Sequence, residues 1–117
     1  MIPYVSAITL AVRNMSRAVA FYSTLGFDVV YGGHEATFSS LRRGEAYVNL
    51  ALRPDYQPVW WGRVIFHVPD VDTLYAAITT QGLIPQNPPR DAAWGERFFH
   101  ITDPDGHELS FAQRLTT

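Results

Sequence analysis

The side chains most able to carry chemistry in this sequence are Arg63, His67 and His100. Arg63 and His67 fall in an alternating apolar segment, so both are expected on the same side of a strand. An arginine there could hold a carboxylate, phosphate or enolate oxygen, and either histidine could act as an acid or a base. The alternative for Arg63 is an internal ion pair with Glu108 or Glu35, because a partly buried charge needs a partner. The sequence leaves these two roles of Arg63 open.

A metal site is a second possible chemistry. His67, His100 and Glu108 would form one if they converged in the fold. Nothing in their spacing demands convergence, so the favoured interpretation places both histidines in a pocket or an interface. It leaves Glu108 and His107 solvated beside a turn. The chain has no cysteine, which excludes disulfides, thiolate ligands and a cysteine nucleophile.

Composition excludes several classes of partner. The formal net charge is −2, and no basic run is longer than Arg42-Arg43, which does not suit nucleic acid. No apolar run approaches the length of a membrane span, and the apolar start of the chain has no basic segment before it. We therefore expect a cytoplasmic protein that binds neither nucleic acid nor a membrane.

The elements that position the candidate residues come from an internal repeat. Residues 8–15 align with residues 64–71 at a constant offset of 56, which later pairs Gly26 with Gly82. Each copy begins with the alternation of a half-buried strand and continues with the apolar stripe of a helix. Each helix is expected to end at its glycine. The chain is thus predicted to contain one β-α unit twice.

The remaining segments predict further strands in both halves. Asn14 and Asp70 are expected to cap the two helices, and the next strand is expected to start at Phe27 or Leu83. The other candidate strands are residues 28–32, 36–42, 46–52, 97–102 and 108–113, with a turn at residues 103–106. The predicted fold class is therefore α+β, with two tandem β-α-β-β-β modules at about residues 1–55 and 60–117. We expect one domain over residues 1–117, with a linker at residues 53–61.

Three motifs resemble the vicinal oxygen chelate superfamily, which includes glyoxalases, dioxygenases and bleomycin resistance proteins. They are residues 18–27 (Ala-Val-Ala-Phe-Tyr … Leu-Gly-Phe), residues 66–72 (Phe-His-Val-Pro-Asp-Val-Asp) followed by Gly82, and residues 103–109 (Asp-Pro-Asp-Gly-His-Glu-Leu). The resemblance covers nearly the whole chain. It implies a mixed sheet that curls around a cavity, and a homodimer in which strands are sometimes exchanged.

The resemblance also places the family's four metal-ligand positions at Ala7, Asn49, Arg63 and Ser110. Alanine cannot ligate a metal, arginine stays protonated and repels a cation, and asparagine and serine are weak neutral ligands. A shift by one residue would move each position to the other face of its strand. The resemblance therefore implies a member without the usual metal, and we expect no cofactor, with a divalent metal as the alternative.

The cavity faces would instead offer a mixed surface suited to a small organic ligand. The candidate ligand-binding residues are Tyr47, Asn49, Trp60, Arg63, His67, Trp94, His100 and Ser110. Trp61 is assigned to a subunit interface, where tryptophan is enriched.

Three functions remain open at this point. The first is a metal-free protein that binds a drug or natural product. The second is an enzyme of the same family, a lyase, dioxygenase or isomerase, with an unorthodox metal site or metal-free chemistry. The third is a structural or regulatory domain without a ligand, in which the tryptophans serve association.

Overall fold

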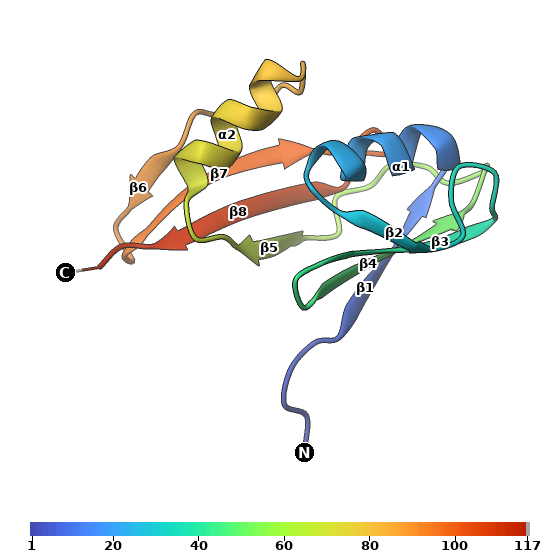
Figure 1. The fold of residues 1–117 in the computed structure, drawn as a ribbon, viewed down its shortest axis with the longest axis horizontal. Helices are drawn as coiled ribbons and strands as arrows, with labels where there is room; N and C mark the ends of the chain where they lie inside the picture. Colours follow the sequence, from blue (N-terminus) through green and yellow to red (C-terminus); the bar gives the residue numbers. More distant parts are fainter. Residues whose placement is uncertain (117) are drawn as a thin grey trace. The chain divides into compact units, whose positions relative to one another are not determined.

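The computed structural model describes residues 1–116 and divides the chain into two compact units, Met1–Pro58 and the segment from Val59 onward. In the first unit, β1 (Ala7–Val12), α1 (Met15–Thr24), β2 (Asp28–Tyr31), β3 (Phe38–Arg43) and β4 (Ala46–Leu52) follow in that order (Figure 1). In the second, the order is β5 (Arg63–His67), α2 (Val71–Thr80), β6 (Arg90–Ala92), β7 (Glu96–Thr102) and β8 (Glu108–Arg114). The predicted α+β class and the doubled β-α-β-β-β order are confirmed.

Each unit has its own four-stranded mixed sheet. The strand orders are β1-β4-β3-β2 and β5-β8-β7-β6. In both sheets the first strand is parallel to the last, and the other pairs are antiparallel. The parallel pairing follows from the helix, which returns the chain to the same end of the sheet before the hairpins begin. No helix within residues 1–116 is long and apolar enough to cross a membrane.

Both helices begin and end where the sequence predicts. The side chain of Asn14 accepts a hydrogen bond from the Arg17 N–H, and Asp70 accepts one from the Thr73 N–H. These side chains satisfy amide groups that the first helical turn leaves without partners. Gly26, with φ of +100°, follows the end of α1 in a left-handed conformation that a side chain would disfavour.

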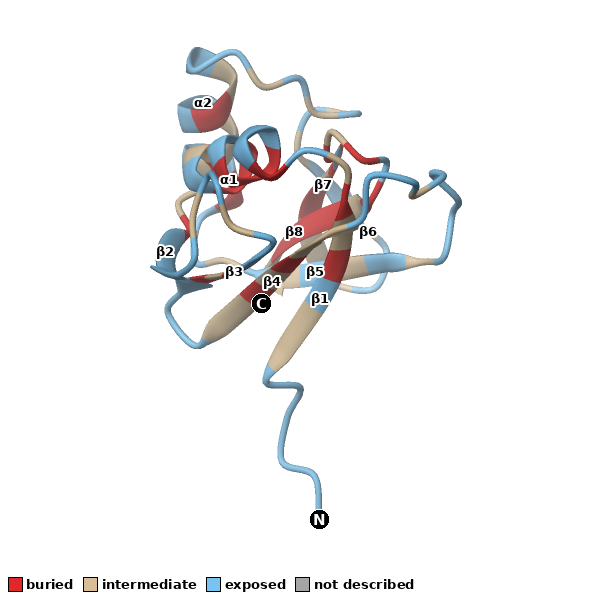
Figure 2. Cartoon of the chain, turned by 90° about the vertical axis from the view of Figure 1, so that its right-hand side faces the viewer, coloured by how far each residue is buried: buried red, intermediate tan, exposed pale blue. Residues whose placement is uncertain are grey.

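The core of each unit lies on one face of its sheet, beneath the helix. In the first unit Leu10, Val48 and Leu50 are buried with Tyr22 of α1. In the second, Phe99, Ile101, Leu109 and Phe111 are buried with Ile78 of α2. Figure 2 shows these buried segments in red on both helices and along β8. Because strand side chains alternate, the residues between them point to the opposite face, called here the open face of each sheet.

The strand predicted to start at Leu83 is wrong. Residues 83–89 form no strand, and β6 begins only at Arg90. Pro85, Pro88 and Pro89 lack the amide hydrogen that a ladder needs, which keeps this stretch irregular. The Gln86 N–H still donates to the carbonyl of His100 at 2.8 Å, so the stretch runs beside β7 without pairing regularly with it.

Candidate ligand-binding site

The open face of the second unit carries most of the polar candidates in three rows. Strand pairing sets the rows, because residues that face one another across a sheet lie side by side. The rows are Arg63–Glu108–Thr102, then Ile65–Ser110–His100, then His67–Ala112–Phe98–Arg90. The small side chains of Ser110 and Ala112 are covered by the longer side chains of the neighbouring strands, and each residue is 3% exposed. The sequence predicted the residues of β5 and β8 on this face but not Thr102, Phe98 and Arg90.

Arg63 is paired within its own row. Its Nε and Nη2 both contact Oε1 of Glu108, its partner in the parallel pairing of β5 and β8. Of the two roles that the sequence left open, the structure shows the internal ion pair, and it selects Glu108 rather than Glu35. The Glu108 side chain is 16% exposed, so this carboxylate depends on the guanidinium for compensation.

His100 occupies the middle row without a partner for one ring nitrogen. Its Nδ1 is buried and accepts or donates no hydrogen bond within residues 1–116. Burial lowers the pKa of His100, the positive charges of Arg63 and Arg90 lower it further, and Glu108 opposes them. The ring is therefore held neutral at pH 7. The structure thus places a neutral imidazole beside Ser110, with its unpartnered nitrogen buried and Ser110 only 3% exposed.

An aromatic shelf lies next to His100. Trp94 stacks on Phe98 with ring centres 6.0 Å apart and planes 24° from parallel, and the His100 ring lies 4.9 Å from Phe98. The Trp94 Nε1–H donates to Oε1 of Glu96 at 2.8 Å, which fixes the indole while leaving the residue 72% exposed. The Arg90 guanidinium lies over the Phe98 ring, 5.1 Å from its centre. Phe98 itself is 7% exposed, so the surface open to a planar ring is the outer face of the Trp94 indole, with Phe98 packed behind it.

Sequence reasoning missed Phe98 because a run of two phenylalanines hides the alternation. Phe99 faces the core and Phe98 faces the open side, although the two residues have the same chemistry. The turn predicted at residues 103–106 could have identified Phe98. It makes residues 97–102 and 108–113 an antiparallel hairpin in which Ser110 pairs with His100. Phe98, two residues before His100 on the same strand, then lies on the open face as well.

The open face of the first unit is less charged. Asn49 lies between Thr9 and Ser40 in register, and its Nδ2 donates to the Thr9 hydroxyl at 3.3 Å. One row away, the Arg42 guanidinium lies 5.5 Å from the centre of the Tyr47 ring. The predicted residues Tyr47 and Asn49 therefore share one face, and hydroxyl and amide groups line its middle.

The four positions that the resemblance assigns to metal ligands do not fit a divalent cation. Arg63 brings a positive charge that Glu108 already engages, and Ala7 has no donor atom. Asn49 and Ser110 offer only neutral oxygens.

The alternative set of His67, His100 and Glu108 does not converge either. His67 pairs with Ala112, four residues along β8 from Glu108, which is about 13 Å in a strand. No group of three or more His, Cys, Asp or Glu within residues 1–116 is placed to hold a metal ion.

The tryptophans before β5 differ from each other. Trp60 is 68% exposed, whereas the Trp61 Nε1–H donates to Nδ1 of His107 at 2.8 Å. His107 is 3% exposed, so the expectation that it is solvated is wrong. Its backbone N–H donates to Oδ1 of Asp103, and this turn-closing bond draws the ring inward. Trp61 therefore has a structural role within its own unit.

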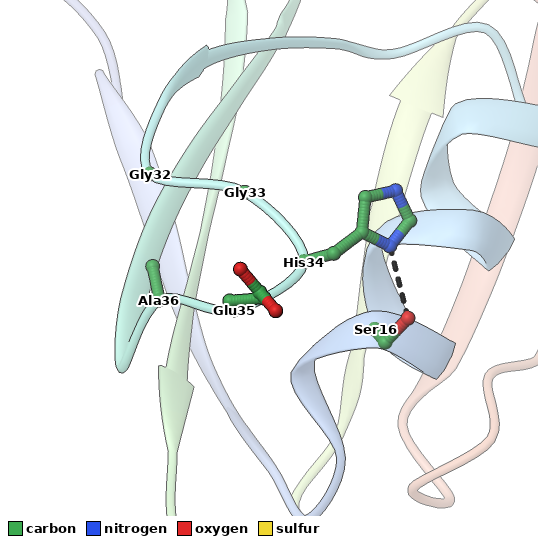
Figure 3. Close-up of a pocket in the computed structure, with 6 residues that line it drawn as sticks. All are labelled: Ser16, Gly32, Gly33, His34, Glu35 and Ala36. Carbon is green, nitrogen blue, oxygen red and sulfur yellow. Dashed lines mark hydrogen bonds between the residues drawn. The ribbon is translucent and has the colours of Figure 1, made fainter.

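A separate hollow of about 690 Å³ lies between the start of α1 and the loop that joins β2 to β3 (Figure 3). It is lined by Ser16, Gly32, Gly33, His34, Glu35 and Ala36. The Ser16 hydroxyl and Nδ1 of His34 are 3.0 Å apart, and both residues are exposed. The hollow has no aromatic or large apolar lining and contains none of the predicted ligand-binding residues, so it does not suit an organic ligand.

Comparison with known proteins is consistent with this geometry. Residues 4–111 match the sequence model of the Glyoxalase/Bleomycin resistance protein/Dioxygenase superfamily. The chain belongs to this superfamily. A bleomycin resistance protein from Geobacillus stearothermophilus is 30% identical, over 91% of this chain and 93% of its own length.

Solved structures of the superfamily share the fold. A member from Sphaerobacter thermophilus has a TM-score of 0.78 and 26% identity, over 97% of this chain and 98% of that one. A bleomycin-binding protein in complex with bleomycin has a TM-score of 0.80 and 24% identity, over 97% of this chain and 99% of that one. The predicted membership of the superfamily is therefore confirmed.

Proposed function

We propose that this superfamily member binds a small organic molecule with a planar ring, and that it does so without a metal. The aromatic shelf of Trp94 and Phe98 carries the proposal, because an exposed indole fixed by its own hydrogen bond is a preformed stacking surface. The exposed Arg90 lies over the Phe98 ring and can orient polar groups of the ligand. A relative named bleomycin resistance protein and a bleomycin complex of the same fold make bleomycin the first ligand to test.

The absence of a metal from the binding mechanism is part of the proposal. It is supported by the chemistry of Ala7, Asn49, Arg63 and Ser110, which offers a cation no anionic or imidazole ligand. We further propose that the protein acts as a homodimer. Apolar side chains near the start of the chain support this, since Ile2, Tyr4 and Val5 are each at least 69% exposed. Light scattering of the purified protein would test the dimer, and a monomeric mass at micromolar concentration would exclude it.

Calorimetric titration tests the binding function. We expect bleomycin or one of a panel of planar aromatic compounds to bind the metal-stripped protein. Trp94→Ala should weaken that binding about 10-fold, because stacking on an aromatic side chain contributes on the order of 1–3 kcal/mol. Tyr31→Ala is the matched control, since Tyr31 is an aromatic residue of the other unit with a similar exposure of 67%. Its affinity should be that of the wild type.

Two results would contradict the proposal. If Trp94→Ala and the wild type bound the ligand with equal affinity, the shelf would not be part of the binding site. Stoichiometric metal in protein purified without chelator, together with ligand binding that is lost on chelation, would replace the metal-free mechanism by a metal-dependent one.

A further inference from the structure

The arginines of the second unit differ in how they are neutralised. Arg63 is paired with Glu108, and Arg97 is held by Asp72 and Asp91 with N···O distances of 2.9 and 3.0 Å. Arg90 forms no ion pair with any of residues 1–116, and its guanidinium contacts the Phe98 ring. Arg90 is therefore a guanidinium on the open face, beside the shelf, whose hydrogen-bond donors remain available to an anion.

Arg90 is held beside the aromatic shelf rather than away from it. Its guanidinium and the Trp94 indole both contact Phe98, at 5.1 and 6.0 Å from the centre of that ring. A cation above an aromatic face is held by the ring quadrupole, yet its N–H groups stay free at the rim. The exposed indole and the unpaired cation are thus both positioned by the same ring.

His100 borders the same ring but offers a ligand no second donor through its unpartnered nitrogen. Its ring lies 4.9 Å from the Phe98 ring, and its Nδ1 is buried and has no hydrogen-bond partner within residues 1–116. Arg90, in contrast, is exposed. Arg90 therefore supplies accessible hydrogen-bond donors beside Phe98.

We propose that Arg90 is the residue that selects the ligand, and that the ligand class is planar aromatic carboxylic acids. The ring stacks on the exposed face of Trp94, and the carboxylate accepts hydrogen bonds from Arg90. This inference rests on the proposed binding function and sharpens it by naming the chemical class. It also moves anion recognition from Arg63, where the sequence suggested it, to Arg90.

Three probes with one ring system test the class. 2-Naphthoate, 2-naphthamide and 2-naphthylmethylamine are titrated into the protein at low salt by calorimetry, and the Trp94 indole N–H is followed by NMR, assigned with Trp94→Phe. We expect 2-naphthoate to bind about 10-fold more tightly than 2-naphthamide, since the carboxylate forms an ion pair with the guanidinium in a bidentate geometry that the neutral amide cannot match. The amine should bind most weakly, and the preference for the acid should shrink at high salt.

Variants locate the effect. Arg90→Gln should abolish the preference for the acid by lowering 2-naphthoate affinity far more than 2-naphthamide affinity, and Arg90→Lys should retain part of it because the charge remains. Arg53→Gln is the control for net charge, since Arg53 is an exposed arginine of the other unit. It should behave as wild type. Arg90 is exposed and its side chain makes no hydrogen bond within residues 1–116, so these variants should fold, which circular dichroism would verify.

The outcomes separate the inference from the function beneath it. Equal affinity of wild type for the acid and the amide would overturn the role of Arg90 and leave the binding function standing. A preference that survives in Arg90→Gln but is lost in Arg63→Gln would also overturn it. Failure of all three naphthalenes and of bleomycin to bind would overturn the proposed function together with the inference.

Discussion

The hydrogen bond between Trp61 and His107 allows a quantitative test of the second unit's architecture. The Trp61 Nε1–H lies 2.8 Å from Nδ1 of His107, and the rings are tilted with their centres 5.9 Å apart. Trp61→Phe keeps an aromatic ring in this position and removes only the donor. Because His107 is 3% exposed, water does not readily replace that donor.

The expected cost follows from this burial. A buried acceptor left without its donor loses about 1–3 kcal/mol of stability. For a chain of this size, each kcal/mol corresponds to about 4 °C in Tm, so Trp61→Phe should lower Tm by about 4–12 °C. Trp60→Phe is the matched control. It removes an indole from the adjacent position, which is 68% exposed, and should change stability by no more than about 0.5 kcal/mol.

Urea unfolding followed by far-ultraviolet circular dichroism is the suitable assay, because both substitutions alter tryptophan fluorescence directly. The midpoint should shift for Trp61→Phe with an unchanged m-value. Equal midpoints for the two variants would refute the reasoning, since the hydrogen bond would then contribute nothing beyond an exposed indole. A larger loss for Trp60→Phe would place the structural tryptophan at the wrong position.

Three further predictions concern single positions. The pKa of His100 is lowered in the folded protein, so the unfolded chain binds a proton more readily at this residue, and the free energy of unfolding should fall as pH drops below about 6.5. His100→Gln should reduce that loss of stability in urea titrations at pH 5 and 7. An NMR titration that placed the pKa of His100 above 6.5 would contradict this. Gly32→Ala should destabilise the first unit by more than 1 kcal/mol in thermal melts, since φ is +78° and the added Cβ would lie 2.3 Å from the Phe38 carbonyl oxygen. Gly33→Ala is the control and should lower stability less, because the added Cβ would have no atom within 4 Å. Asn14→Ala should cost about 1 kcal/mol, as loss of an N-cap does, and an unchanged urea midpoint would count against the cap.

Much of the fold was predictable because local and global signals agree in this chain. Asn14 and Asp70 cap the helices, the glycines after them end the helices, and alternation separates the core face from the open face. Because the unit is repeated, each sequence pattern occurs twice, and a weak strand prediction in one half is supported by the corresponding segment in the other. The error at Leu83 arose where the repeat breaks, because three prolines enter only the second copy.

The candidate site was predictable only in part. Arg63, Ser110 and His100 could be placed on one face by counting along strands, since the period of two is strict. The ion-pair partners could not be predicted by counting along strands, because they depend on how far side chains reach across neighbouring strands. The pairing of Arg63 with Glu108 and the position of Arg90 over Phe98 therefore had to come from the structure.

The contact between Arg63 and Glu108 has a consequence for how this sequence can change. The Glu108 side chain is only 16% exposed, so replacing Arg63 alone by a histidine or glutamine would leave its carboxylate unpaired and poorly solvated. Positions 63 and 108 are therefore epistatic: a substitution tolerated in one background is harmful in the other. A descendant of this chain could regain a metal ligand at position 63 most readily after Glu108 had already become neutral, which gives the order in which such mutations should accumulate.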